Sequence, residues 1–421
     1  MIETKFKQTE LGPIPEDWNI YTLGTVSDIK TGPFGSALHA SDYVRFGTPI
    51  ITVEHLGEPY IIHALNIPLV GVEDKKRLSQ YTLRTGDIVY SRVGSVDRNS
   101  VVTEKEDGWL FSGRLLRVRN SGNYYAPYLG YHLNSNNAKK RIVSSAVGLG
   151  MPSINTKILG EHVILLPNNI DEQKRIAEAL SDVDDLILEL DALIEKKRAI
   201  FQGSMQELLT GRRRLPGFNE SWREVAFKDL GYTYNGLSGK TGVDFGHGDS
   251  KFIMFVNVIY KDTVSPLYFG TVDISNSEKQ NKVQQNDLIF NTSSETPEEV
   301  GMCTCVSEGY QNLYLNSFCF GFRFHESNVN ARFITFMLRS KIGRKLMMEL
   351  AQGSTRYNLP KRRFLSSTIN LPKDKREQDE IALILSDMTK EIEELEAKRK
   401  KYAAIRQGMM QQLLTGKIRL I

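Results

Sequence analysis

The chain has 421 residues, 40% hydrophobic and 25% charged, with a formal net charge of +4 at pH 7. This composition is typical of a globular protein and excludes wholesale disorder, and the length predicts roughly two to four domains. The cysteines Cys303, Cys305 and Cys319 form no Cys-x-x-Cys pattern, which excludes a four-cysteine zinc site and a disulfide framework. The polar N-terminus and the lack of a long apolar run predict a cytoplasmic protein without signal peptide or membrane span.

Residues 1–168 are predicted to form a first globular domain of mixed α/β (α+β) class, with short strands between glycine and asparagine turns. A helix is predicted over 128–146. The stretch 134–158 around it is basic and contains no acidic residue. The strand-like runs are PIITVEHL (49–56), DIVYSRV (87–93) and GRLLRVRN (113–120).

Residues 169–211 are predicted to form a long helical spacer. Its apolar residues recur at alternating spacings of four and three, as in a coiled coil. Lys197 interrupts this pattern, Gly203 is expected to weaken or bend the helix, and Gly211 is expected to end it. The predicted seam consists of Ile176, Leu180, Val183, Ile187, Leu190, Ile194 and Phe201.

Residues 212–373 are predicted to form a second domain of the same class, with a helix over 332–351. Basic residues gather in the stretch 339–363, where Glu349 is the sole acid. The strand-like runs here are KFIMFVNVIY (251–260), DLIFNT (287–292) and FCFGFRF (318–324).

Residues 374–421 are predicted to form a second helical spacer. Arg399 and Arg406 interrupt its seam, and such polar breaks can specify the register of a coiled coil. Gly408 and Gly416 take the places of the two glycines of the first spacer. The predicted seam consists of Ile381, Leu385, Met388, Ile392, Leu395 and Tyr402.

The two spacers are copies of one sequence. Residues 171–215 align with 376–420 without a gap, and roughly 24 of the 45 positions are identical. The domains before them repeat more faintly, as in GDIVY (86–90) and NDLIF (286–290). This repeat predicts two helices of about 38 residues, or about 57 Å, paired antiparallel and related by an approximate two-fold axis. The alternative is two ordinary amphipathic helices packed on separate cores.

Catalytic motifs are absent from the sequence. Gly239-Lys240-Thr241 lacks the first glycine of a P-loop, because Tyr234 stands there. The histidines are scattered, and there is no Gly-x-Ser-x-Gly motif and no amino-methyltransferase tetrapeptide. The sequence therefore favours binding over catalysis and predicts no metal site. Basic stretches at matching places in both repeats suit contacts with phosphates.

The chain resembles the specificity subunits of type I restriction-modification enzymes over nearly its whole length. The resemblance rests on four features and on their order, and two of the features are duplicated. The four features are LGPIPEDW (11–18), the LPxxxxEQ entries at 166–173 and 371–378, the helix ends QELLTG and QQLLTG, and the bridge RRRLPGFNESW (212–222). The resemblance implies that each domain is a target recognition domain that reads one half of a bipartite site in double-stranded DNA. It implies that the helices set the spacing of the half-sites and dock two modification (methyltransferase) subunits, which restriction subunits can join. S-adenosylmethionine, ATP and Mg would belong to those partners, and this chain would not itself be an enzyme.

Within this interpretation, polar and basic loop residues are the candidate DNA contacts, because such side chains pair with bases and phosphates. In the first domain they are Ser36, His39, Arg92, Ser95, Arg98, Asn99, Lys139, Lys140 and Arg141. In the second they are Ser238, Lys240, Asn291, Thr292, Arg356, Tyr357, Lys361, Arg362 and Arg363. Two alternatives stay open: a coiled-coil structural adaptor that does not read DNA sequence, and a stand-alone nuclease or methyltransferase.

Overall fold

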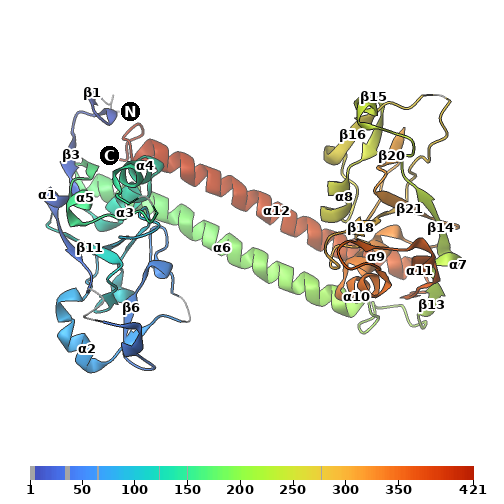
Figure 1. Ribbon diagram of the computed structural model, residues 1–421, viewed down its shortest axis with the longest axis horizontal. Helices are drawn as coiled ribbons and strands as arrows, with labels where there is room; N and C mark the ends of the chain where they lie inside the picture. The colour runs from blue at the N-terminus through green and yellow to red at the C-terminus, as the bar shows by residue number, and fades with distance from the viewer. Residues whose placement is uncertain (1–4, 34–37, 64–65, 123, 149, 276) are drawn as a thin grey trace. The chain divides into compact units, whose positions relative to one another are not determined.

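The computed structural model describes residues 5–33, 38–63, 66–122, 124–148, 150–275 and 277–421. The chain forms two compact units (Figure 1). The first contains Met1–Asp191 and Lys398–Ile421, and the second contains Ala192–Ala397. Both divisions fall inside a long helix, so each unit contains half of each long helix. No helix of the described part is long and apolar enough to cross a membrane.

The core of the first unit is an antiparallel sheet with the strand order β4-β11-β8-β9. All four side chains of the central strand β8 are buried, as its apolar sequence predicts. A second sheet, β10-β6-β7-β5, contains one parallel pair, β10 with β6. The strands are β4 (Ser27–Thr31), β5 (Tyr43–Val44), β6 (Thr48–Ile51), β7 (Leu69–Val70), β8 (Ile88–Ser91), β9 (Asn99–Val101), β10 (Leu110–Phe111) and β11 (Leu115–Asn120).

The helix predicted over 128–146 is in fact two helices, α3 (Ala126–Asn134) and α4 (Asn136–Ser145). Ser135 between them has an extended backbone, with ψ 147°, and its hydroxyl accepts a hydrogen bond from the Ala138 N–H at 3.3 Å. A serine in this role starts a new helix because it satisfies a free N–H of the first turn. The prediction was wrong because it read Ser135 as an interior residue.

The second unit repeats this plan, with the antiparallel sheet β14-β21-β17-β19 and a three-stranded sheet β16-β15-β20. Its pair of helices is α9 (Ala331–Arg339) and α10 (Lys341–Leu350), and Ser340 caps α10 as Ser135 caps α4. The strands are β14 (Gly231–Asn235), β15 (Phe245–Ile253), β16 (Phe269–Val272), β17 (Leu288–Asn291), β19 (Cys303–Cys305), β20 (Leu313–Leu315) and β21 (Cys319–Phe324).

The strand predicted over 251–260 is only partly correct. β15 ends at Ile253, and Phe255–Tyr260 forms a short helix, α8. The side-chain amide of Asn257 donates to the carbonyl oxygens of Ser265 at 2.9 Å and Tyr268 at 3.2 Å, which fastens this helical turn to the following loop. These partners lie outside the apolar run, and a short apolar run alone does not distinguish a helix from a strand.

Smaller elements complete both units. In the first they are β1 (Phe6–Thr9), β2 (Gly12–Pro15), β3 (Trp18–Thr22), β12 (Val163–Pro167), α1 (Leu23–Val26), α2 (Val72–Arg77) and α5 (Thr156–Gly160), with 3₁₀ helices at Ala40–Asp42, Val53–His55, Ser79–Tyr81 and Glu104–Glu106. In the second they are β13 (Arg223–Ala226), β18 (Ser293–Ser294), β22 (Tyr357–Asn358), β23 (Thr368–Leu371), α7 (Phe227–Leu230) and α11 (Lys361–Ser366), with 3₁₀ helices at Gly242–Asp244 and Pro266–Tyr268.

The two long helices are α6 (Ile170–Leu208) and α12 (Lys375–Leu413), each of 39 residues. Within the first unit Arg406 forms an ion pair with Asp184, and Arg399 Nε lies 3.0 Å from Asp191 Oδ1. A step of one heptad forward in α6 therefore matches a step of one heptad back in α12, which confirms the antiparallel pairing (Figure 1). In the second unit Lys197 Nζ lies 2.6 Å from Glu391 Oε1. The polar breaks in the seam are thus partners in ion pairs between the helices.

Of the thirteen predicted seam residues, six are buried and seven are half-buried. The ends of the long helices pack into the domain cores, because clusters of buried residues join the start of one helix to the end of the other within each unit. Ile176, Leu180, Leu190, Ile194, Ile381 and Leu385 are buried, whereas Val183, Ile187, Phe201, Met388, Ile392, Leu395 and Tyr402 are half-buried.

The four spacer glycines divide into two kinds. Both helices continue without interruption through Gly203 and Gly408, so the expected weakening does not appear as a break. Gly211 and Gly416, with φ of 67° and 70°, take the left-handed conformation just after the helix ends. This confirms them as stops, since glycine adopts that conformation without steric cost.

Each unit contains a cluster of Trp, Arg and a buried Glu, which we call the clasp. In the first unit Glu172 accepts hydrogen bonds from Trp18 Nε1 at 3.2 Å and from Arg419 Nη2 at 2.8 Å. The equivalent clasp of the second unit is Trp222 Nε1 to Glu377 at 3.3 Å and Arg214 Nε to Glu377 at 2.7 Å. The arginine comes in each case from the tail after a long helix, α12 for the first unit and α6 for the second.

Candidate nucleic-acid interface

Two loops meet at the same place in both units. In the first unit the loop after β8 lies against the loop after α4, where the Ile154 N–H donates to the Arg92 carbonyl at 2.9 Å and Val93 pairs with Ser153. In the second, the Leu359 N–H donates to the Thr292 carbonyl at 2.9 Å, and β18 pairs with β22. We call each arrangement a loop pair. It joins the turn after the central strand to the loop after the basic helix, two of the segments chosen from the sequence.

The same arginine–aspartate ion pair lies at the start of the central strand in both units, and sequence reasoning missed it. Arg119 Nε lies 2.7 Å from Asp87 Oδ1 at the start of β8, and Arg323 Nε lies 2.9 Å from Asp287 Oδ1 at the start of β17. Both carboxylates are buried, and the hydrogen bond to Asp87 raises the pKa of Arg119. The available signal was the aspartate shared by GDIVY and NDLIF, which occurs before the same strand in both repeats.

In the first unit, His39, Ser95 and Lys140 are exposed. Arg92 and Arg98 are half-buried, and the Arg98 guanidinium donates to the Leu56 carbonyl. Asn99 has no exposed surface and accepts a hydrogen bond from Asn134 Nδ2 at 3.2 Å. Ser36 lies outside the described residues.

Two of the three adjacent cations of α4 in the first unit contact other parts of the chain. Lys139 forms an ion pair with Glu58, and Arg141 Nη2 donates to the Val163 carbonyl at 3.2 Å. Burial lowers the pKa of Arg141 and lowers that of His132 to about 3. His132 is therefore neutral, and its Nε2 accepts a hydrogen bond from the Leu165 N–H at 3.3 Å. Of the three adjacent cations, Lys140 alone is exposed.

In the second unit, the exposed candidates are Ser238, Arg356, Arg362 and Arg363. Thr292 and Tyr357 are half-buried in the loop pair, and Asn291 has no exposed surface. The two lysines are half-buried and partnered. Lys240 Nζ lies 2.7 Å from Glu278, whereas Lys361 donates to Asn235 and lies 5.4 Å from the centre of the Phe320 ring.

Two arginines of the basic stretch 339–363 have structural roles. Arg339 Nη1 donates to the Cys303 carbonyl at 2.7 Å, and its Nη2 donates to the Ile259 carbonyl at 2.8 Å. Arg344 Nη2 donates to the Glu298 carbonyl at 2.8 Å. Both arginines add to the positive charge of this stretch in the sequence. In the structure their guanidinium groups donate to backbone carbonyls of the same unit.

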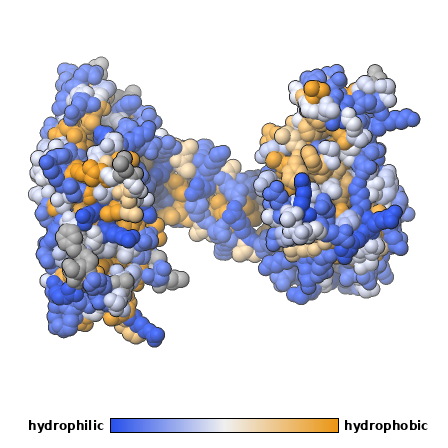
Figure 2. Space-filling view, viewed as in Figure 1, coloured by the Kyte–Doolittle hydropathy of each residue, from blue (hydrophilic) through white to orange (hydrophobic). Residues whose placement is uncertain are grey.

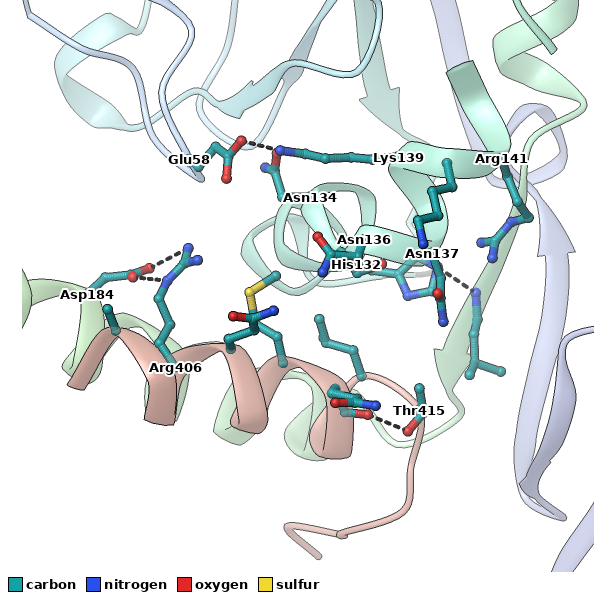
Figure 3. A pocket seen from close by; sticks show the side chains of 18 of the residues that line it. Glu58, His132, Asn134, Asn136, Asn137, Lys139, Arg141, Asp184, Arg406 and Thr415 are labelled. Atoms are coloured by element: carbon teal, nitrogen blue, oxygen red, sulfur yellow. Dashed lines mark hydrogen bonds and ion pairs between the residues drawn. The ribbon is translucent and has the colours of Figure 1, made fainter. Parts of the chain in front are cut away.

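A groove of about 780 Å³ lies in the first unit between α4, α6 and α12 (Figure 3). Asn136, Asn137 and Lys140 line one wall, and Leu188 and Met410 line the helical wall. Figure 3 shows the Arg406–Asp184 ion pair on the helical side and the Glu58–Lys139 pair on the other. Its volume is in the range of ligand pockets, about 300–1,000 Å³. No residue of the loop pair lines it, so the groove and the loop pair are separate features.

The described surface does not carry the signs of a metal or thiol centre. No three His, Cys, Asp or Glu side chains gather as metal ligands among the described residues. All three cysteines are buried, and burial raises the pKa of Cys303 and Cys319 to about 12. Figure 2 shows a surface that is mostly hydrophilic, with apolar residues in smaller groups.

The sequence matches one protein family twice. The family is described as the type I restriction modification DNA specificity domain, and the matches cover residues 15–197 and 219–403. The chain belongs to this family. Each match contains one globular part and most of the long helix after it, so the duplication within this type I specificity chain is a duplication of the family's domain.

Two specificity subunits of Methanocaldococcus jannaschii are similar to part of the chain. The type I restriction enzyme MjaX specificity subunit is 33% identical over 218 residues, and the MjaVIII specificity subunit is 27% identical over 223 residues. The matches cover 49% and 51% of this chain and 49% and 50% of those proteins. The chain thus spans about half the length of the curated relatives it matches.

Solved structures of the same kind share the fold over nearly the whole chain. The S subunit of a type I restriction-modification system from M. genitalium has a TM-score of 0.60 at 14% identity and covers 97% of this chain and 98% of its own. A chain from a structural study of complex assembly and conformational transition of the type I R-M system has a TM-score of 0.56 at 16% identity, covering 96% and 99%. These identities are low, so the likeness establishes the fold and confirms the predicted class.

Proposed function

We propose that this chain is the sequence-reading subunit of a type I restriction-modification complex, and that each unit binds one half of a bipartite site in double-stranded DNA. The observation that carries this proposal is the loop pair. Both units build it on the same sheet order with the same backbone hydrogen bond, from Ile154 to Arg92 and from Leu359 to Thr292. The residues on this shared framework differ, with RVGSVDR (92–98) in one unit and TSSETPE (292–298) in the other. Such a design suits two different half-sites.

Exposed cations supply the contacts with phosphates. Lys140 is exposed on α4 in the first unit, and Arg356, Arg362 and Arg363 are exposed in the second, where Arg356 directly precedes β22 of the loop pair. Contacts of this kind position a protein on DNA, whereas hydrogen bonds to base edges select the sequence. Asn99 and Asn291 are left out of the proposed interface, because both side chains are buried.

We also infer that the chain performs no catalytic step and that two modification subunits dock on it. The lack of a catalytic motif and the inert, buried cysteines support the first inference. The duplication of the spacer helix supports the second, since two copies of one surface suit two copies of one partner. S-adenosylmethionine would then be bound by the modification subunits, and ATP and Mg by restriction subunits.

The test is a map of methylated adenines. Co-expression of the chain with its modification subunit, followed by single-molecule sequencing, is expected to give one bipartite motif with a fixed gap. The motif should vanish without this chain. Exchange of residues 1–168 for the recognition domain of another specificity subunit should alter one half of the motif and leave the other. An unaltered motif after this exchange would favour the structural adaptor.

A further inference from the structure

Four apolar residues of the second unit are exposed on two segments that adjoin its loop pair, and we call them the apolar patch. Met254, Phe255 and Val256 are 40%, 38% and 38% exposed, and Phe318 is 63% exposed. Apolar residues are visible over α8 in the second unit (Figure 2). Single exposed apolar residues are normal on a protein surface, whereas a group of them marks a place where another molecule binds.

Hydrogen bonds join both segments of the apolar patch to the loop pair. The N–H of Thr292, whose carbonyl closes the loop pair, donates to the Phe318 carbonyl at 3.0 Å. The Asn316 side chain links the two segments, because its Nδ2 donates to the Ile253 carbonyl at 2.8 Å and its Oδ1 accepts from the Phe318 N–H at 2.9 Å. Ile253 directly precedes Met254. The apolar patch therefore adjoins the surface that is proposed to bind DNA.

The first unit has charged side chains at two of the equivalent positions. Arg114 takes the place of Phe318, since each carbonyl accepts from the residue just after the central strand, β8 or β17. Glu54 takes the place of Val256, since each lies three residues after a strand with a parallel partner, β6 or β15. The hydrogen bond from Thr52 lowers the pKa of Glu54 most, and the charge of Arg114 adds to this effect. An acid and a base in one unit are thus two apolar residues in the other.

The chemistry of DNA limits what an apolar surface can recognise there. The backbone presents charged phosphates, and the base edges present mainly hydrogen-bond donors and acceptors. The exception in the major groove is the C5-methyl group of thymine, which apolar side chains such as phenylalanine contact. A surface of Phe, Met and Val gains free energy by covering this methyl group. The charged surface of the first unit instead suits polar groups.

We propose that Phe318, with the adjoining Met254 and Val256, recognises the C5-methyl group of a thymine in the half-site of the second unit. This inference rests on the proposed function and names a chemical group that one half-site presents. Arg356, exposed directly before β22 of the same loop pair, supplies a contact with a phosphate. Covering one methyl group corresponds to about a fourfold change in Kd.

The experiment removes the methyl group from the DNA. Deoxyuridine pairs as thymidine does and lacks the C5-methyl group alone. Duplexes with the motif from the methylation map carry deoxyuridine at each thymine in turn, and fluorescence anisotropy gives the Kd for the full chain with its modification subunit. The half-site of the second unit is the half that stays unaltered when residues 1–168 are exchanged. At one or two thymines of this half, Kd should rise about fourfold, and thymines of the first half-site should give no such rise.

Side-chain variants assign the methyl contact to Phe318. Phe318→Ala should raise Kd for the thymine duplex at least about fourfold and remove the further rise with deoxyuridine, because the two changes delete the same contact. Phe318→Leu should keep most of the deoxyuridine response, since leucine is also apolar. A matched control is Val243→Ala. Val243 is 80% exposed and precedes the start of β15, whereas the apolar patch follows its end, so Kd and the deoxyuridine response should not change.

Three results would contradict one or the other proposal. A second half-site without thymine, or equal deoxyuridine responses in Phe318→Ala and the unaltered chain, would overturn the methyl contact and leave the proposed function intact. Loss of the modification subunit from Phe318→Ala, with the deoxyuridine response kept, would make the apolar patch a protein contact and overturn the methyl contact as well. A methylation map without a bipartite motif that depends on this chain would instead contradict the proposed function itself.

Discussion

Replacement of Arg419 by alanine should selectively destabilise the first unit. The Arg419 side chain is 9% exposed and that of Glu172 is 1% exposed. Without Arg419 the Glu172 carboxylate keeps one neutral donor, Trp18 Nε1 at 3.2 Å. A buried charge left without its partner costs about 3–5 kcal/mol. The equivalent Arg214 is 26% exposed, so Arg214→Ala should cost less, about 1.5–3 kcal/mol.

The assay is urea unfolding followed by tryptophan fluorescence in a Trp222→Phe background. The remaining tryptophans, Trp18 and Trp109, both belong to the first unit, so the signal reports that unit. With an m-value of about 2–3 kcal/mol/M, the midpoint should fall by roughly 1–2 M. Addition of Glu172→Gln should restore part of the loss, because an amide carries no charge to bury. An unchanged midpoint in Arg419→Ala, or a further fall on adding Glu172→Gln, would refute the reasoning.

Three further predictions concern acid, DNA and the buried asparagine. Burial lowers the pKa of His132 to about 3 and of His162 to about 4, so the unfolded chain binds protons that the folded one does not. The first unit should therefore lose stability as pH falls from about 6.5 towards 4, by up to about 1.4 kcal/mol per pH unit for each histidine. Equal urea midpoints at pH 7 and pH 5 would contradict this prediction. Arg356→Ala should weaken DNA binding by about 1–3 kcal/mol and relax the motif at one position if Arg356 reads a base, whereas Lys140→Ala should mainly lower the salt dependence of binding. Titrations at several salt concentrations and a methylation map check both. Unchanged binding and an unchanged motif would remove Arg356 from the candidate DNA contacts. Asn99→Ala should destabilise the first unit by about 1–3 kcal/mol and leave the methylated motif unchanged. An altered motif in a stably folded variant would show that Asn99 belongs to the DNA interface.

The helical part of the fold was predictable because its signal is local and duplicated. Spacings of four and three from Ile176 onward predict a coiled coil, and the copy in α12 predicts a second one. Arg399 and Arg406 interrupt the seam of one helix, and their partners Asp191 and Asp184 lie on the other. The repeat predicted the antiparallel pairing, and the structure supplies the ion pairs that fix its register.

The candidate site was less predictable, because the roles of arginines depend on partners distant in sequence. Arg98 and Arg141 bind the carbonyls of Leu56 and Val163, and Arg339 binds that of Cys303. A basic stretch in the sequence does not reveal these acceptors. Burial likewise removes Asn99 from the surface, although its type and its place after β8 are typical of a base-reading residue.

The clasp has a consequence for the order in which the units are completed during translation. The core of the first unit includes Met410, Leu413 and Leu414 from the end of α12, and its clasp requires Arg419. The ribosome makes Met1–Asp191 first and then the whole of the second unit, Ala192–Ala397, before these residues emerge. At a translation rate of about 5–20 residues per second, the core of the first unit lacks these residues for roughly 10–40 s. The second unit is a single continuous stretch of chain and meets no such delay, so the unit that is begun first is finished last.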